Sequence, residues 1–338
     1  MTPAIFGLSG LTLSADERAF FRECDPAGYI LFGRNIDTPA QVRALTDDLR
    51  TIHGRDKLLV SIDQEGGRVA RLRPPHFSAF PTGAAFDALY EIAPSSAIAA
   101  ARMNAHAMGI ELAEAGITVD YYPSLDVRQH GAHDVIGDRS FGFEPMRVAA
   151  LGRAVLEGLA AAGVAGCIKH MPGHGRTSVD THKALPTVSA REDELETDLA
   201  PFKALRDAPI GMTGHLVFTA WDDALPATQS PTVIRDVIRG RIGFEGLLLT
   251  DDIDMEALSG SVPERAQIAV AAGCDLALNC WAKMDDMIGI AERLPAMSPE
   301  TAARLERALA DTGIGPEGDK AHLLAQRDTL LAMAEASA

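Results

Sequence analysis

Several features are scarce in this sequence, and each scarcity excludes a class of protein. Aromatic residues make up only 5% of the 338 residues. No apolar run approaches the ~20 residues of a membrane-spanning helix, and the first residues lack the basic segment and apolar core of a secretory signal. The four cysteines show no CxxC spacing, which is typical of free thiols in a reducing compartment. We therefore expect a cytoplasmic protein that does not act at a membrane.

Positive charge is also scarce. Lysine and arginine total 31 against 47 acids, so the net charge is −16, which argues against nucleic acid as a partner. No glycine-rich phosphate-binding motif is present, so a nucleotide cofactor is not expected. His170 and His174 have the i, i+4 spacing of helical metal ligands, but Pro172 and its flanking glycines exclude a helix there. The sequence thus predicts neither a metal nor an organic cofactor.

What the sequence does contain is a repeated alternation of short apolar runs and helical patterns. Eight β–α units are the number that closes a parallel TIM-type (β/α)8 barrel, while a doubly wound open sheet is the alternative. From Ser298 the pattern is helical, with a break at 313–318, so we expect one domain over 1–338: a barrel over about 4–295 and C-terminal helices over about 298–338. The predicted strands are 4–8, 28–32, 58–62, 118–123, 166–170, 210–215, 246–250 and 274–278, and helices are predicted at 39–52, 97–115, 147–162, 192–206, 232–241 and 263–272.

Ionisable residues end or follow four of these predicted strands: Asp63, His170, His215 and Asp251. In a barrel the carboxyl ends of all strands surround a single pocket, whereas an open sheet gathers them at one crevice. The spread of these residues over four separate strands favours the barrel.

The loop after the fifth predicted strand is rich in groups that can transfer protons. Asp180 and His182 are two residues apart, so in an extended segment their side chains leave on the same face and can hydrogen-bond. The carboxylate would orient the imidazole and raise the histidine pKa above its usual value of about 6.5. The alternative is an aspartate that forms a local turn beside a solvent-exposed histidine. Because Lys169, His170 and His174 lie in the same stretch, we favour a catalytic pair.

A second group of acids ends the seventh predicted strand. One of Asp251, Asp252 and Asp254 can act as a nucleophile or stabilise a positive charge, and another can cap the following helix. Spacing alone does not identify which acid does which.

Five further polar residues are candidates for binding a polyhydroxylated or amide-bearing ligand, with structural salt bridges at the barrel mouth as the alternative. They are Asp63, Arg71, Arg139, Lys169 and His170.

Four ordered motifs carry a resemblance to a known family. The stretch 169–175, continued to Asp180-Thr181-His182, together with 63–71, 137–142 and 250–255, resembles glycoside hydrolase family three, and more narrowly its bacterial cytoplasmic β-N-acetylhexosaminidases of peptidoglycan recycling. The resemblance covers about residues 5 to 281. Met171 and the run Tyr121-Tyr122-Pro123 depart from the commoner residues of that family.

The resemblance implies a TIM barrel and a retaining mechanism. By it, Asp251 would be the nucleophile and His182, oriented by Asp180, the acid/base, while the five candidate binding residues would hold N-acetylglucosamine. The implied substrate is an N-acetylglucosaminyl-1,6-anhydromuramyl fragment, with or without peptide. We expect a monomer or weak dimer. A β-glucosidase, a glycoside phosphorylase of the same family and a non-catalytic sugar-binding barrel remain as alternatives.

Overall fold

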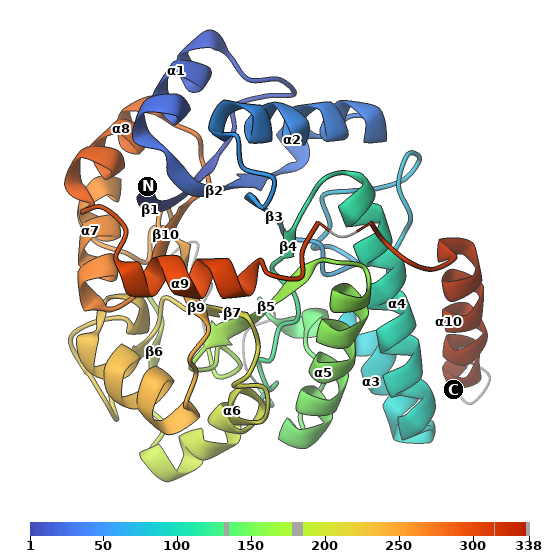
Figure 1. Cartoon of the computed structure of the whole chain (residues 1–338). Helices are drawn as coiled ribbons and strands as arrows, with labels where there is room; N and C mark the ends of the chain where they lie inside the picture. The colour runs from blue at the N-terminus through green and yellow to red at the C-terminus, as the bar shows by residue number, and fades with distance from the viewer. Residues whose placement is uncertain (132–134, 178–184, 314, 336–338) are drawn as a thin grey trace.

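The computed structural model describes residues 1–131, 135–177, 185–313 and 315–335. Eight parallel strands close into a barrel, in the order β1-β10-β9-β7-β5-β4-β3-β2 (Figure 1). The barrel that the β–α alternation predicted is therefore confirmed. Its strands are β1 Thr2–Gly7, β2 Pro26–Leu31, β3 Leu59–Ile62, β4 Val119–Asp120, β5 Ala165–Met171, β7 Ile210–Thr213, β9 Leu247–Asp252 and β10 Leu276–Asn279.

The barrel interior is filled by every second residue of the strands. In β9, Leu247 and Leu249 pack inside, whereas Leu248 packs outside against the helices. Such alternation is what a closed sheet requires, because successive side chains point to opposite faces. The barrel is thus a packed core, and only its two ends can hold a site.

Helices surround the strands. They are α1 Ala15–Cys24, α2 Pro39–His53, α3 Gly83–Ile92, α4 Pro94–Glu114, α5 Pro145–Ala161, α6 Glu192–Ala204, α7 Val262–Ala272 and α8 Met284–Arg293. Helix α2 shows why these segments are helical: Thr38 caps its first turn, Pro39 opens it, and Gly54 ends it in a left-handed conformation with φ of 60°.

One predicted helix differs in type from the others. The segment predicted as helical at 232–241 forms a wider π-helix, η4, over Val233–Ile242. Its apolar residues still pack on the barrel, and the sequence carries no signal for the wider turn. Short 3-10 turns lie at η1 Gly33–Asn35, η2 Gly137–Arg139 and η3 Ala227–Gln229, and β6 Thr187–Val188 pairs with β8 Val217–Phe218 outside the barrel.

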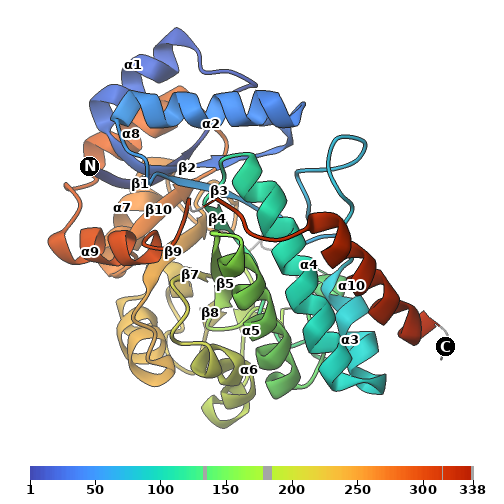
Figure 2. The same cartoon turned by 45° about the vertical axis from the view of Figure 1, so that its right-hand side comes forward.

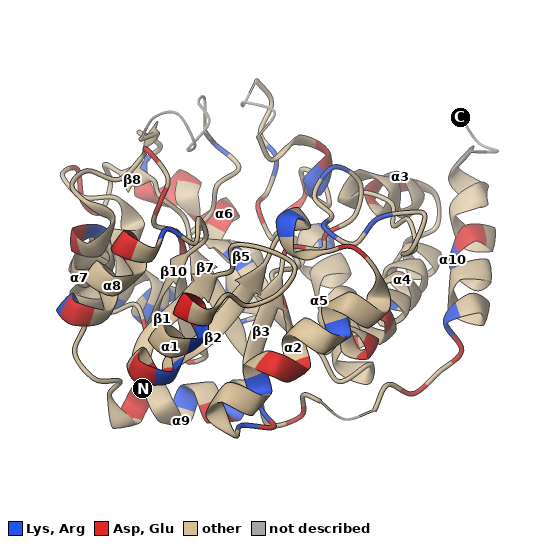
Figure 3. Cartoon of the chain, turned by 90° about the horizontal axis from the view of Figure 1, so that it is seen from above, with Lys and Arg blue, Asp and Glu red and all other residues tan. Residues whose placement is uncertain are grey.

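The last two helices close the amino end of the barrel and extend its side. Helix α9 (Pro299–Ala308) places Leu305 and Ala308 in the interior cluster, so it covers the end at which the strands begin. Helix α10 (Lys320–Glu335) lies against α4 and α3 (Figure 2). Because α9 covers one end, the opposite end is left for a pocket. Figure 3 shows acidic and basic residues interleaved along the surrounding helices.

Candidate active site

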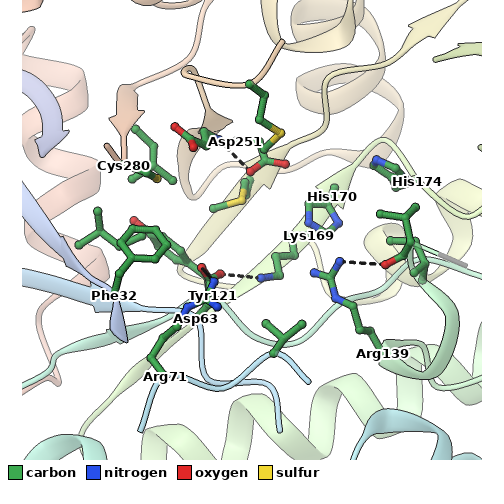
Figure 4. A pocket seen from close by; sticks show the side chains of 18 of the residues that line it. Phe32, Asp63, Arg71, Tyr121, Arg139, Lys169, His170, His174, Asp251 and Cys280 are labelled. Carbon is green, nitrogen blue, oxygen red and sulfur yellow. Dashed lines mark hydrogen bonds and ion pairs between the residues drawn. The ribbon is translucent and has the colours of Figure 1, made fainter. Parts of the chain in front are cut away.

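A cavity of about 260 Å³ lies at the carboxyl ends of the strands. Its walls come from β2, β5, β7, β9 and β10 and from the loops that follow β3 and β4 (Figure 4). Among its lining residues are all six predicted site residues that the structure describes: Asp63, Arg71, Arg139, Lys169, His170 and Asp251. Asp180 and His182 lie outside the described residues, so their predicted pairing stays a prediction.

One wall is a network of ion pairs. Asp63 follows β3 and accepts hydrogen bonds from Arg71 Nη2 at 3.0 Å and from Lys169 Nζ at 3.1 Å. Burial opposes ionisation of Asp63, but these two cations outweigh it and lower the pKa below its usual range. Arg71 also lies over the ring of Phe32, 5.1 Å from its centroid. Asp63 thus contacts two cations, and Arg71 contacts both a carboxylate and an aromatic ring.

Glu65 anchors the same wall from behind. Its carboxylate binds Arg139 through two bonds, from Nε at 2.8 Å and Nη2 at 2.7 Å, and Lys169 Nζ at 2.7 Å. Glu65 is 2% exposed. Burial would raise its pKa, but the two cations keep the pKa far below the usual value. Glu65 therefore fixes the direction in which the side chains of Arg139 and Lys169 point toward the cavity.

A second wall is built from histidines. His170 Nδ1 lies 2.7 Å from Asp126 Oδ2, which also accepts the hydroxyl of Ser124. The other oxygen of Asp126 accepts the backbone N–H of His170 at 3.2 Å and of His174 at 2.7 Å. Burial opposes the charge on Asp126, yet the neighbouring His170 lowers the carboxyl pKa. With Asp126 ionised, Nδ1 of His170 donates, and its ring is fixed at the cavity wall.

His174 also lines the cavity and is 3% exposed. Burial lowers its pKa to about 4, so the ring is neutral near pH 7. It can accept or donate a hydrogen bond but carries no charge toward a ligand.

Asp251 closes the site from the end of β9. Its Oδ1 accepts the N–H of Asp252 at 2.8 Å, and its other oxygen accepts no hydrogen bond from the described residues. Burial would raise the pKa of Asp251, but the neighbouring His170 and His215 and the hydrogen bond from Asp252 lower it below the usual value. The result is an ionised carboxylate with a free oxygen at the cavity wall. Such a group can attack an electrophilic carbon or stabilise a cation.

The two neighbouring acids behave differently. Burial and the nearby Asp254 raise the pKa of Asp252 well above its usual value, in contrast to that of Asp251. Asp254 accepts hydrogen bonds from Asn279 Nδ2 at 2.8 Å and from the N–H of Cys280 at 3.0 Å, which ties β9 to β10. None of these three acids caps the next helix, because Ser261 does. The geometry therefore separates Asp251 from the acids that the spacing could not distinguish.

The sequence interpretation did not single out Glu65, Asp126 or His174 as part of this site. Glu65 lay within a quoted motif and Asp126 followed a predicted strand, but nothing local marks their partners. The sequence marks His174 only by its spacing from His170 and by its place near the predicted catalytic pair. Within the described ranges, no group of three or more His, Cys, Asp or Glu side chains is arranged to hold a metal ion.

Comparison with known proteins adds the family. Residues 8–310 match the N-terminal domain of glycosyl hydrolase family 3. The chain belongs to glycoside hydrolase family 3. It is a glycoside hydrolase, as the motifs predicted.

Its relatives include the beta-hexosaminidase of Alkalilimnicola ehrlichii, 38% identical over 310 residues that cover 90% of this chain and 88% of the relative. The beta-hexosaminidase of Bordetella avium is 35% identical, over 91% of this chain and 88% of the relative. Among solved structures, NagZ from Neisseria gonorrhoeae in complex with N-trifluoroacetyl-D-glucosamine superposes with a TM-score of 0.88, at 30% identity and 98% coverage of both chains. In the described parts of this chain, no helix combines the length and apolar character that a membrane crossing needs.

Proposed function

We propose that this chain is a retaining, exo-acting β-N-acetylglucosaminidase. Its substrate is an N-acetylglucosaminyl-1,6-anhydromuramyl fragment, with or without peptide, which arises in cell-wall recycling in the cytoplasm. The observation that carries the proposal is Asp251, an ionised carboxylate that lines a cavity of fixed hydrogen-bonding groups and has one oxygen without a bond from the described residues. Similarity to beta-hexosaminidases over 90–91% of this chain supports the choice of an amino sugar.

The first chemical step is attack by Asp251 on the anomeric carbon. A covalent glycosyl–enzyme intermediate forms, and water then hydrolyses it with net retention of configuration. The acid that protonates the leaving oxygen is His182, oriented by Asp180, and the neutral imidazole then activates the water. This assignment rests on the motif in the sequence, because both residues lie outside the described part of the chain.

The sugar ring is held by the ion-pair wall. Asp63 accepts from ring hydroxyls, while Arg71, Arg139 and Lys169 present N–H groups whose directions their carboxylate partners fix. His170 completes the contacts from the second wall. A polyhydroxylated ring needs such a mixture of donors and acceptors.

The test is a comparison of three 4-nitrophenyl β-glycosides. We expect release of 4-nitrophenol from the N-acetylglucosaminide at a kcat/KM well above those for the glucoside and the N-acetylgalactosaminide. Preference for the glucoside would identify a β-glucosidase, and binding without turnover would identify a sugar-binding barrel. Product analysis in phosphate buffer decides the remaining alternative, since formation of a sugar 1-phosphate would show phosphorolysis.

A further inference from the structure

Glu65 lies behind the ion-pair wall and is not among the residues that line the cavity. It nevertheless contacts two cations that do line it, Arg139 and Lys169, at 2.7–2.8 Å. The side chains of Lys169 and Glu65 are 2% and 3% exposed. Water therefore contributes little to stabilising these charges, and the carboxylate must balance them.

Glu65 is one of two carboxylates in direct contact with the cations of the ion-pair wall. Three cations, Arg71, Arg139 and Lys169, contact Asp63 and Glu65. Of the carboxylates that the structure describes, Glu65 alone forms an ion pair with Arg139. Without Glu65, the three cations would share only Asp63, and the wall would gain one positive charge.

An excess positive charge matters in an enclosed site. Charges interact strongly where water is largely excluded, so an unbalanced cationic pocket would attract phosphate, sulfate or an acidic sugar. The protein as a whole carries a net charge of −16, so a positive potential in the pocket can come only from the groups nearest to it. Glu65 lowers the positive charge of the wall but leaves the N–H donors of Arg139 and Lys169 in place, which suits an uncharged ring.

We propose that Glu65 is a positioning and specificity-determining residue, which directs Arg139 and Lys169 into the cavity and offsets part of their charge so that the site takes an uncharged sugar ring rather than an anionic ligand. This inference rests on the proposed function, because it treats the cavity as the sugar-binding site. Glu65 acts only through its two cations and touches no ligand.

The experiment uses Glu65→Gln with Glu111→Gln as the matched control. Glu111 in α4 is also a buried carboxylate paired with a lysine, Lys320 at 2.9 Å, but it lies away from the cavity. Binding of inorganic sulfate is measured by titration calorimetry at constant ionic strength, and KM and kcat are measured with the 4-nitrophenyl N-acetylglucosaminide.

We expect Glu65→Gln to bind sulfate about tenfold or more tightly than the parent and to raise KM about tenfold. Glu111→Gln should change both quantities less than about twofold, whatever its effect on stability. Glu65→Gln with unchanged sulfate affinity would overturn the charge-balancing role, and an unchanged KM would overturn the positioning role.

A second background keeps the test valid if Glu65→Gln does not fold. Lys169→Met and Lys169→Met/Glu65→Gln differ only at Glu65, and the double variant removes both members of one buried ion pair. The added Glu65→Gln change must again strengthen sulfate binding and raise KM, because Arg139 still depends on Glu65. If the sulfate affinity and the KM are the same in the two variants of this pair, the proposal is refuted. Calorimetry needs no turnover, so failure of the inference is distinct from failure of the parent to hydrolyse the N-acetylglucosaminide.

Discussion

Two aspartates at opposite ends of the barrel show how a carboxylate is used for structure and for chemistry. Asp275 precedes β10 at the end that α9 covers, and it accepts four hydrogen bonds, from Arg239, Arg304, Thr301 and the N–H of Leu248, at 2.8–3.0 Å. Asp251 lies next to the last residue of the adjacent strand β9 and accepts one hydrogen bond, from the N–H of Asp252. Asp275 has no bonding capacity left, whereas Asp251 keeps toward the cavity an oxygen that no described residue bonds. The difference predicts that one serves stability and the other reactivity.

The largest expected effect is on catalysis at the mouth. Asp251→Asn should reduce the hydrolysis rate to less than about a hundredth of the parent value, because a carboxamide cannot attack the anomeric carbon. The midpoint of thermal unfolding should change little, since the carboxylate makes only one hydrogen bond. Initial rates and melting curves of the same preparation measure both. A variant that retains more than about a hundredth of the rate would remove Asp251 from the role.

Substitution of Asp275 should lower the stability of the fold without changing the rate of hydrolysis. Asp275→Asn leaves Arg239 and Arg304 without their buried partner, which we expect to cost about 3–5 kcal/mol of unfolding free energy. Denaturant unfolding measures this loss, and active-site titration gives the rate per folded molecule, which should stay near the parent value. A large fall in that rate would show that the two barrel ends are coupled.

Asp126 tests whether the role of a carboxylate depends on its place in the barrel or on the number of hydrogen bonds that it accepts. It lies at the mouth, but like Asp275 it accepts four hydrogen bonds, including that of His170 Nδ1. Asp126→Asn should therefore lower both stability, by about 1–3 kcal/mol, and kcat/KM. Ser124→Ala removes one bond but keeps the charge, and it should have a smaller effect on both. If Asp126→Asn lowered stability but not kcat/KM, Asp126 would have a purely structural role like that of Asp275.

The smallest expected effect is a dependence of stability on pH. The pKa of His174 is lowered to about 4 by burial, whereas an unfolded histidine titrates near 6.5. The unfolded state therefore binds more protons between these values. The contribution of His174 is present above about pH 6.5 and is lost as the pH falls toward 4. His174→Gln should make the melting temperature fall less over this range, and an unchanged slope would contradict the assignment.

The fold and much of the site were predictable from the sequence because they depend on local order. The strand-to-helix alternation predicted the eight barrel strands, and the rule that strand carboxyl ends meet at one mouth placed Asp63, His170 and Asp251 together. Motif resemblance added the roles of Arg71 and Arg139, which remain proposals.

The supporting carboxylates could not be predicted in the same way. The Glu65–Arg139 pair spans 74 residues and the Asp126–His170 pair spans 44, so each depends on the closed barrel. Which of Asp251, Asp252 and Asp254 is reactive also depends on contacts with β10, through Asn279 and Cys280. The pairing of Asp180 with His182 stays a prediction of the sequence.

The most direct measurement traps the intermediate. A 5-fluoro N-acetylglucosaminyl fluoride slows the second step, so the sugar should remain covalently attached and be found by mass spectrometry of the digested protein. The account predicts one label per molecule, on the peptide that contains Asp251, and none in Asp251→Asn. A label on another carboxylate, or turnover of the substrate with inversion at the anomeric carbon, would contradict it.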